Sequence, residues 1–433
     1  MGLKSSPFPA LNEAFAMTNQ REPLTIVTRP SDEIDRILDW IAPDHPLAFV
    51  RNGEGIVGVG ELLRLEFRGA DRFAAAAAAW SELTRTAIVH DSVNRAGTGL
   101  IAFGSFAFAG SSSAVSVLII PRVIVGNREG SHWVTTISAG EANTMPDTTD
   151  ALATLPRHPH GAAVHVSFAP GDMSTTAFTT AVTAALQEIA LSRAEKLVIA
   201  RDQVAQLPAG ADLRVPIAAL ATRYPDTFTF AVDGLIGSSP ETLVNVHNGT
   251  VSARVLAGSA ARGDNHSSDE QAAATLTGSL KDQQEHALAL ASVMDALRPL
   301  SRELHAASSP FALQLPNLWH LATDIEGQLA ERSSALDLIG ILHPTAAVAG
   351  TPTPAALQII DLLEGFDRGR YAGPVGWVDA DGNGEWAVAL RCAQVDGTRI
   401  TAYAGAGIVT GSDAERELAE TELKFRPIIE AFA

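Results

Sequence analysis

The hydrophobic and polar positions of this chain change period many times, so strands are expected in pairs between single helices. Apolar runs and period-two alternation predict strands at 47–51, 55–60, 62–67, 100–108, 115–125, 133–138, 226–260 (several in succession), 317–325, 375–379, 385–395 and 399–409. Helical spacing predicts helices at 31–41, 71–86, 174–192, 280–307, 334–341, 354–364 and 412–433. This order is typical of an α+β fold with mainly antiparallel sheets, and not of a doubly wound parallel sheet.

One motif in the first third is compatible with either a nucleotide-binding loop or a β-hairpin. Residues 53–58 spell Gly-x-Gly-x-x-Gly, but a true dinucleotide fingerprint opens a helix whose N-terminus takes the pyrophosphate. Here the residues from Ile56 to Phe67 continue as a β-branched and leucine-rich strand, and Asn52-Gly53 is a favoured type I′ turn pair. We therefore expect a hairpin and no nucleotide.

Composition narrows the class of protein. Of the 433 residues, 46% are apolar, which is enough for a large buried core. A net charge of −18 argues against nucleic-acid binding, because no basic stripe could release counterions from a phosphate backbone. An anionic substrate would instead need positive charge concentrated locally, by a metal and a few Lys or Arg. The single cysteine, Cys392, fits a reducing cytosol. We read no signal peptide at 1–19, and the longest apolar run, at 74–79, is too short to cross a membrane.

The last predicted helix carries the most informative charges. Glu417, Glu420 and Lys424 are spaced by three and four residues, so their side chains share one helix face. Two carboxylates and an ammonium in this arrangement could hold a hard divalent cation and the anion that it binds. The alternative is a solvated face on which Glu420 and Lys424 form an ordinary i,i+4 pair, worth about 0.3–0.5 kcal/mol.

Three upstream residues have the chemistry of a reaction site. Lys196 opens a short apolar strand; such a lysine is usually a surface charge, but in a closed, desolvated site its amine becomes a usable general base. Glu241 follows Pro240 and would act as a general acid if a partly apolar pocket raised its pKa. Arg391 lies in the apolar strand predicted over 386–392, where a buried guanidinium requires an anionic partner such as a carboxylate.

Other positions are compatible with two interpretations. Gly258, Gly405 and Gly407 let backbone N–H groups approach an anion closely, although turn geometry alone would also explain them. Glu285 lies on the predicted helix over 280–307. His320, farther along the chain, either packs in the interior or takes part in the site.

In this order, the segments around these residues resemble those of the chorismate-utilising enzymes over residues 171–433. The matching segments are 196–201, 239–241, 256–259, 281–286, 318–323, 342–345, 371–376, 391–393, 404–407 and 417–424. Within that superfamily the chain is most similar to the isochorismate synthases of menaquinone or siderophore pathways. The resemblance implies one large domain of two stacked, mainly antiparallel sheets flanked by helices. Residues 1–170 would form the N-terminal part of this body and 171–433 its chorismate-binding catalytic region.

The resemblance also implies a role for each candidate residue. Glu285 and Glu420 match ligands of Mg²⁺, with Glu417 contributing through water. Lys196 matches the base that activates water, Glu241 the acid near the C4 hydroxyl, and His320 a histidine beside the ring. The positions that match contacts to chorismate or lie in its binding segments are Gly258, Ser259, Ala347, Tyr371, Arg391, Gly405 and Lys424.

The implied reaction is Mg²⁺-dependent isomerisation of chorismate, with water added at C2 and the C4 hydroxyl lost. The nearest alternative is a salicylate synthase, which also expels pyruvate; those enzymes resemble one another in having a hydroxyl residue where Ala347 stands. Ala346 departs from the common His-Pro-Thr-Pro pattern and blurs this distinction. Aminating anthranilate and aminodeoxychorismate synthases lack the lysine that Lys196 matches. A non-catalytic chorismate-binding protein would lack a metal glutamate or the base. We therefore expect a cytoplasmic monomer without a glutamine amidotransferase subunit.

Overall fold

The computed structural model describes residues 23–43, 45–140, 152–153, 155, 161–162, 164–331 and 333–433. In this part of the chain the strands join into one hydrogen-bonded network, in which only β1 (Leu24–Pro30) and β4 (Ile88–Asp91) pair in parallel. The predicted α+β class with mainly antiparallel strands is therefore confirmed. The loop expected around 147–161 lies almost wholly outside the described residues.

The network bends into two sheets that are joined where β3 pairs with β6. Sheet I contains, in order of pairing, β3 (Glu54–Phe67), β2 (Leu47–Arg51), β10 (Phe228–Val232), β11 (Leu235–Ser239), β20 (Cys392–Asp396), β21 (Arg399–Ile408) and β9 (Lys196–Gln206), with the short β8 (Ala169–Pro170) and β17 (Gly350–Thr351) on β9. Sheet II contains β6 (Ser116–Arg128), β5 (Ile101–Ser105), β18 (Pro374–Asp379), β19 (Gly384–Val388), β12 (Thr242–His247), β13 (Thr250–Ala261) and β16 (Leu318–Leu329), with β14 (Ser301–Ala306) and β15 (Phe311–Gln314) on β16. The edge of β6 that does not pair with β3 is shared: its first part pairs with β5 and its last part with β7 (Ser131–Ala139), which in turn pairs with β1.

The main core lies between the two sheets. Phe49 and Phe230 of sheet I belong to the same buried cluster as Phe103 and Trp386 of sheet II. Because successive side chains of a strand point to opposite faces, the residues next to Phe49 belong instead to a second cluster on the outer face of sheet I. The predicted stacking of two sheets is confirmed.

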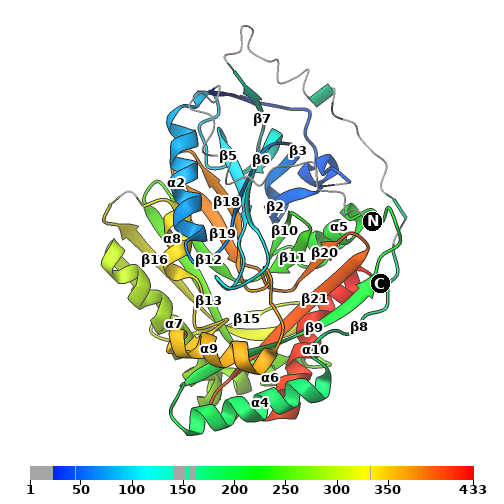
Figure 1. Cartoon of the computed structure of the whole chain (residues 1–433), viewed down its shortest axis with the longest axis vertical. Helices are drawn as coiled ribbons and strands as arrows, with labels where there is room; N and C mark the ends of the chain where they lie inside the picture. The colour runs from blue at the N-terminus through cyan, green and yellow to red at the C-terminus, as the bar shows by residue number, and fades with distance from the viewer. Residues whose placement is uncertain are drawn as a thin grey trace, which may run out of the picture.

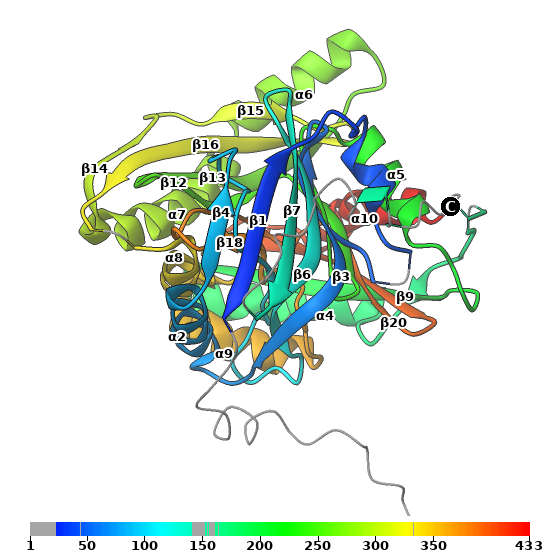
Figure 2. The ribbon, with the colours of Figure 1, turned by 90° about the horizontal axis from the view of Figure 1, so that it is seen from above.

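Helices cover the outer faces of this body (Figures 1 and 2). Along one side lie α2 (Arg72–Arg85), α8 (Ala335–Leu342) and α7 (Leu280–Leu297); along the other lie α5 (Arg214–Arg223) and α10 (Ala414–Ala431). At the lower end of the view in Figure 1 are α4 (Thr175–Ala190), α9 (Thr353–Glu364) and α6 (His266–Gly278).

The two helices that bear the predicted acids have well-defined beginnings. The Ser279 hydroxyl caps α7 by accepting a hydrogen bond from the backbone N–H of Asp282, and the Asp413 carboxylate caps α10 by accepting one from Arg416. Such caps satisfy backbone donors that the first turn of a helix leaves free. They fix where the helical spacing of the acidic residues starts.

Two predicted helices are wrong in extent. The helix expected over 280–307 ends at Leu297, because Pro299 lacks a backbone donor and disfavours helical geometry in the residue before it; 301–306 then forms strand β14. In place of the helix over 31–41 there is only the 3-10 turn Ile37–Trp40, whose apolar residues are buried against the outer face of sheet I. By contrast, the Gly-rich segment 53–58 forms the β2–β3 hairpin, as predicted.

Strands β1, β4 and β15 and helices α5 and α6 were not predicted. Their patterns are short or weakly periodic, and tertiary contacts decide their structure.

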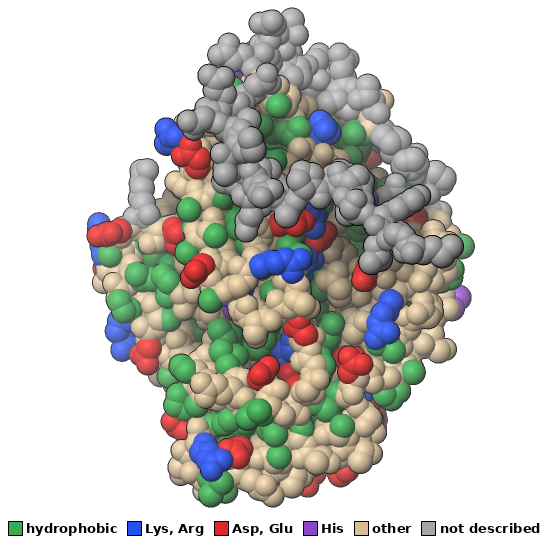
Figure 3. Space-filling view, viewed as in Figure 1, with side chains coloured by type: hydrophobic (Ala, Val, Ile, Leu, Met, Phe, Trp, Pro, Cys, Tyr) green, Lys and Arg blue, Asp and Glu red, His purple; other side chains and the backbone are tan. Residues whose placement is uncertain are grey.

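The described surface carries mixed charges, and the described helices are not of the membrane-spanning type. Lys and Arg side chains are scattered among acidic ones on the face shown in Figure 3. None of the described helices combines the length and the apolar character needed to cross a bilayer.

The packing of Trp386 against the backbone of β5 yields a test of the core. A Cβ atom added to Gly104 would lie 2.4 Å from Cη2 of Trp386 and 2.9 Å from Cδ2 of Leu118. We expect Gly104→Ala to lower the free energy of unfolding by about 1–3 kcal/mol, measured by denaturant unfolding. Gly278→Ala is the control, because a Cβ there would meet nothing within 4 Å. Equal stabilities for the two variants would contradict this account of the core.

Candidate active site

A small cavity of about 40 Å³ lies between the two sheets, near the ends of β9, β13 and β21. Its lining includes eleven of the thirteen predicted site residues: Glu241, Gly258, Ser259, Glu285, His320, Ala347, Tyr371, Arg391, Gly405, Glu420 and Lys424. The other two, Lys196 and Glu417, form ion pairs with Glu285 and Lys281 and are not among the lining residues. We call this space the central cavity.

Lys196 is the most deeply buried charge of the site. It begins β9, and its side chain has no exposed surface. Its Nζ atom lies 3.2 Å from Oε1 of Glu285, an ion-pair distance, yet the orientation does not make a hydrogen bond. The amine is thus held next to the cavity with part of its hydrogen-bonding capacity unused.

Gly407 on β21 makes room for this pair. A Cβ atom at this position would lie 2.0 Å from Oε1 of Glu285 and 3.3 Å from Cε of Lys196. The glycine is therefore required by the close approach of the Glu285 carboxylate. The group that lies closest to this glycine is thus a carboxylate of the protein itself.

Each of the three predicted metal-binding glutamates is paired with a different lysine. Glu285 pairs with Lys196, as described above. Glu420 pairs with Lys424 on the same face of α10, and the Lys424 ammonium also donates to the carbonyl oxygen of Gly405 at 2.8 Å. Glu417, also on α10, accepts a hydrogen bond of 2.7 Å from the ammonium of Lys281 on α7.

The acidic side chains influence one another through the low-dielectric interior. Burial and the neighbouring Glu420 carboxylate both raise the pKa of Glu417. Burial alone would raise the pKa of Glu420, but the Lys424 ammonium outweighs it and holds that pKa below its usual value. Burial also raises the pKa of Asp282, which lies on α7 beside Lys281. The site therefore concentrates negative charge that its own lysines neutralise.

No group of three or more His, Cys, Asp or Glu side chains in the described part of the chain is arranged as a ready-made metal site. The donor set nonetheless suits Mg²⁺, since buried Glu285 and Glu417 and partly buried Glu420 offer carboxylate oxygens, the hard ligands that this ion prefers. In the present arrangement each of these carboxylates faces an ammonium.

Glu241 lies in the turn between β11 and β12, and sheet II fixes its backbone. The Ser239 hydroxyl donates to the carbonyl of Val388 at 2.6 Å, and the backbone N–H of Val388 donates to the carbonyl of Glu241 at 3.1 Å. Burial raises the pKa of Glu241 to about 8, although nearby Lys196, Arg391 and Lys424 act in the opposite direction. At neutral pH its carboxyl group thus carries the proton that a general acid needs.

His320 on β16 is held by hydrogen bonds on both ring nitrogens. Its Nδ1 lies 3.1 Å from the carbonyl oxygen of Gly258 and 3.0 Å from Oγ of Ser259, while Nε2 is hydrogen-bonded to the guanidinium of Arg391. Because a guanidinium can only donate, Nε2 must accept and the ring proton must be on Nδ1. Burial and the positive charges of Arg391 and Lys424 lower the pKa of His320, in agreement with a neutral ring. The positive φ of Gly258, at a bulge in β13, turns its carbonyl towards the histidine.

Arg391 differs from its prediction in one respect. It was expected within a strand over 386–392, but β19 ends at Val388 and β20 begins at Cys392, so Arg391 lies in the break with a φ of 49°. A left-handed residue cannot continue a strand, and the break turns the side chain to the cavity. Within the described residues Arg391 forms no salt bridge. Its buried positive charge thus remains available for an anion that enters the cavity.

Tyr371 and Gly405 close one side of the cavity. A Cβ on Gly405 would lie 3.0 Å from the Tyr371 hydroxyl, so only glycine leaves the phenol in place. The ring of Tyr371 stacks on that of Tyr403 at 5.3 Å between centroids. Burial raises the pKa of Tyr371, which keeps its hydroxyl protonated and able to donate.

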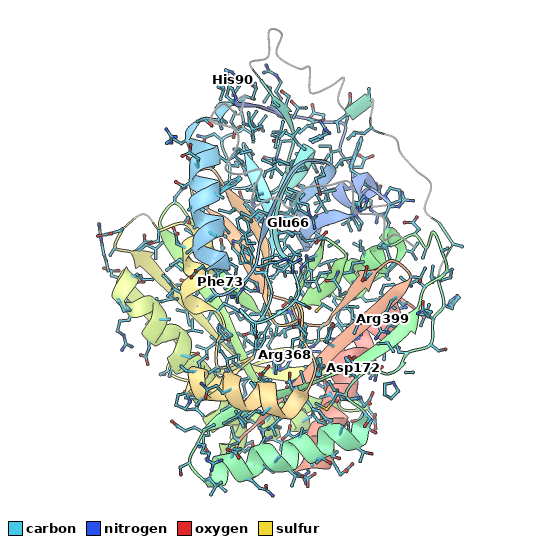
Figure 4. All side chains as sticks on the ribbon, viewed as in Figure 1. Glu66, Phe73, His90, Asp172, Arg368 and Arg399 are labelled. Carbon is cyan, nitrogen blue, oxygen red and sulfur yellow. The ribbon has the colours of Figure 1, made fainter. Side chains whose placement is uncertain are left out.

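Ala347 lines the cavity next to Val348, and a buried ion pair behind them supports this wall. Arg368 lies near the centre of the molecule (Figure 4), where it pairs with Glu364 at the end of α9 and donates to the carbonyls of Val348 and Val198. The ion pair thus ties the loop that carries Ala347 to strand β9, two residues from Lys196.

A larger cavity, of about 390 Å³, lies at a different place and contains none of the predicted site residues. Its lining includes the ion pairs of Arg128 with Glu385 and of Arg254 with Asp324. We place the site in the smaller cavity because the predicted site residues converge there.

Two residues of the site were not assigned a role from the sequence. Lys281 precedes Glu285 by four residues, so the helical spacing indicated that both lie on one face of α7. Tyr403 lines the cavity from β21, and no local signal distinguishes it from a core aromatic residue.

The chain is similar to known isochorismate synthases. The chain is 39% identical over 258 residues to the isochorismate synthase DhbC of Bacillus subtilis, covering 57% of this chain and 65% of that protein, slightly less than two thirds of its length. It is also 39% identical over 262 residues to the isochorismate synthase EntC of Escherichia coli, covering 59% of this chain and 67% of that protein.

Solved structures extend the similarity to nearly the whole chain. The menaquinone-specific isochorismate synthase MenF of Escherichia coli superposes with a TM-score of 0.77 at 25% identity, covering 98% of this chain and 99% of that one. Anthranilate synthase component I of Streptococcus pneumoniae, at 20% identity and a TM-score of 0.69, shares the fold. A family model described as "chorismate binding enzyme" matches residues 10–433, and the chain belongs to that family.

Proposed function

We propose that this protein is an isochorismate synthase, an isomerase that converts chorismate to isochorismate by adding water at C2 and releasing the C4 hydroxyl. The proposal rests on a candidate proton donor and a candidate proton acceptor that lie close to the same cavity. Glu241 holds a proton at neutral pH, and Lys196 forms an ion pair with Glu285 of the cavity lining and has hydrogen-bonding capacity unused. The names of the similar proteins DhbC, EntC and MenF support the same reaction.

The reaction needs one proton removed and one supplied. Lys196, in its neutral form, takes a proton from water while the oxygen attacks C2. The two conjugated ring double bonds then each shift by one position, from C1=C2 and C5=C6 to C1=C6 and C4=C5, as the C4–O bond breaks. Glu241 gives its proton to the C4 hydroxyl, which leaves as water. One water is added and one is lost, so substrate and product are isomers, and each positioned group contributes about 10²–10⁴-fold.

The cavity also supplies positive charge for a dicarboxylate. Arg391 is buried without an ion-pair partner among the described residues, and the Tyr371 hydroxyl lies nearby to donate; we assign them to the enolpyruvyl carboxylate. Lys424 and the backbone of Gly258 and Gly405 provide further contacts. Neutral His320 fixes Arg391 through its ring nitrogen and so acts as a positioning residue for the same group.

We assign Mg²⁺ to the carboxylates between α7 and α10. Glu285 and Glu420 would hold the ion directly and Glu417 through water. When bound, the ion would neutralise charge at the ring carboxylate and fix its orientation. The residues themselves contribute by excluding water and presenting hard oxygen ligands.

Because water is the nucleophile, no ammonia has to be delivered. We therefore propose that the enzyme works without a glutamine amidotransferase subunit. We also propose that it is a monomer. Its one cysteine, Cys392, is buried, which suits a reducing cytoplasm. The product would feed menaquinone or siderophore synthesis.

The product of the reaction tests the proposal directly. Purified protein incubated with chorismate and Mg²⁺ should yield isochorismate alone on chromatography, and Lys196→Met should lower kcat by about 10²–10⁴-fold with an unchanged circular dichroism spectrum. Salicylate plus pyruvate would identify a salicylate synthase. Conversion by neither protein would indicate a chorismate-binding protein without catalysis.

The raised pKa of Glu241 predicts the pH dependence of the forward reaction. Its acid form predominates below about pH 8 and is lost as the pH rises through that value, so kcat should fall on the alkaline side with an apparent pKa near 8. Measured kcat–pH profiles would show this limb in the wild type. In Glu241→Gln, which cannot ionise, the residual rate should lack it. An alkaline limb that persists in Glu241→Gln would assign the titration to another group.

The space at Gly407 predicts how closely the Glu285–Lys196 pair is positioned. Gly407→Ala forces the Glu285 carboxylate away from β21, and a misplacement of about 1 Å costs on the order of 100-fold in rate. Gly278→Ala, in open space, should retain wild-type kcat. Thermal melting of both variants separates a local effect from unfolding. Full activity in a folded Gly407→Ala variant would remove this pair from the site.

A further inference from the structure

The Lys281–Glu417 pair differs from the other two lysine–glutamate pairs of the site. The Lys196 side chain is 0% exposed and that of Lys424 is 13% exposed, whereas 30% of the Lys281 side chain is exposed. Lys424 has a second partner in the Gly405 carbonyl, but within the described residues the Lys281 ammonium hydrogen-bonds to Glu417 alone. Of the three ammonium groups, this one can leave for solvent most easily.

The position of Lys281 in its helix is unfavourable for a cation. It is the second residue of α7, after the Ser279 cap and Leu280, where the helix dipole presents positive charge. Helix stability therefore does not explain a lysine here. What does compensate it is the ring of carboxylates in front of it, because Glu417, Glu285 and Glu420 all act electrostatically on its ammonium.

These carboxylates need a cation among them. The side chain of Glu417 is 3% exposed, and its burial next to Glu420 would leave two negative charges in a low-dielectric space. The Lys281 ammonium now neutralises one of them with a 2.7 Å hydrogen bond. A divalent ion that binds the same carboxylates would bring further positive charge next to this ammonium.

We propose that Lys281 is a built-in counter-ion that bound Mg²⁺ must displace from Glu417, so that this lysine weakens the affinity of the enzyme for its metal while it stabilises the metal-free protein. The inference rests on the proposed function, because it assumes that Glu285, Glu417 and Glu420 hold the ion. Lys281 is not among the residues that line the central cavity, and its hydrogen bond is to Glu417.

Metal affinity measured without substrate tests the proposal. Isothermal titration calorimetry with Mg²⁺ on metal-free protein, in the absence of chorismate, should show that Lys281→Met binds about tenfold or more tightly than the wild type, because one competing charge has been removed. Lys281→Arg keeps the charge and should resemble the wild type. The difference should shrink as salt is added, since the competing charge is partly exposed to solvent.

Thermal melting provides a second readout that an ordinary structural lysine would not produce. Lys281→Met should melt at a lower temperature than the wild type without metal, because buried Glu417 loses its partner, and saturating Mg²⁺ should raise its melting temperature more than that of the wild type. In the Glu417→Gln background, Lys281→Met should no longer tighten Mg²⁺ binding, since the two residues act as a pair.

Each contrary result has a distinct meaning. Equal or weaker Mg²⁺ binding by Lys281→Met overturns the displacement model and makes Lys281 an orienting partner of Glu417. A gain that persists in the Glu417→Gln background overturns the assignment of the pair. If the wild type binds no Mg²⁺ at all, the metal site of the proposed function fails, and this inference fails with it.

Discussion

The site depends on one constraint: carboxylates taken out of water between two sheets must each have a positive partner. Glu285, Glu417 and Glu420 come from two helices, and lysines from β9, α7 and α10 neutralise them one by one. Leaving one buried charge unpaired costs several kcal/mol, so these helices and strands cannot shift independently. Of these residues, Glu285, Glu420 and Lys424 line the central cavity.

The backbone around these charges leaves space for some side chains and orients others towards the cavity. The absence of a side chain at Gly407 admits the Glu285 carboxylate, and at Gly405 it leaves space for the Tyr371 hydroxyl. The left-handed conformation of Arg391 interrupts the strand and turns a guanidinium inward, where neutral His320 holds it. At the two glycines the sequence is restricted because there is no room for a side chain, and at Arg391 it is restricted by the left-handed backbone conformation.

Burial also separates the protonation states of the groups that face the cavity. Glu241 keeps its proton because the low-dielectric surroundings outweigh three nearby cations, whereas Glu420 stays ionised because Lys424 is in direct contact. Two carboxyl groups of the same type thus acquire opposite roles within one site. Farther from the cavity, the Glu364–Arg368 pair links the wall at Val348 to β9 and so holds these two segments at a constant separation.

The sequence by itself determined the fold class, the hairpin at 53–58 and the shared face of Glu417, Glu420 and Lys424, because these features follow from local periodicity and turn chemistry. It also indicated Lys196, Glu241 and Arg391 by residue type, and their family by the order of the surrounding segments. The end of the helix from Leu280 at Leu297 follows from Pro299, a local signal that the predicted range of 280–307 overran. Only the tertiary structure decided that Arg391 lies in a break between strands and that Lys281 neutralises Glu417. The second outcome joins residues 136 positions apart, which no local pattern records.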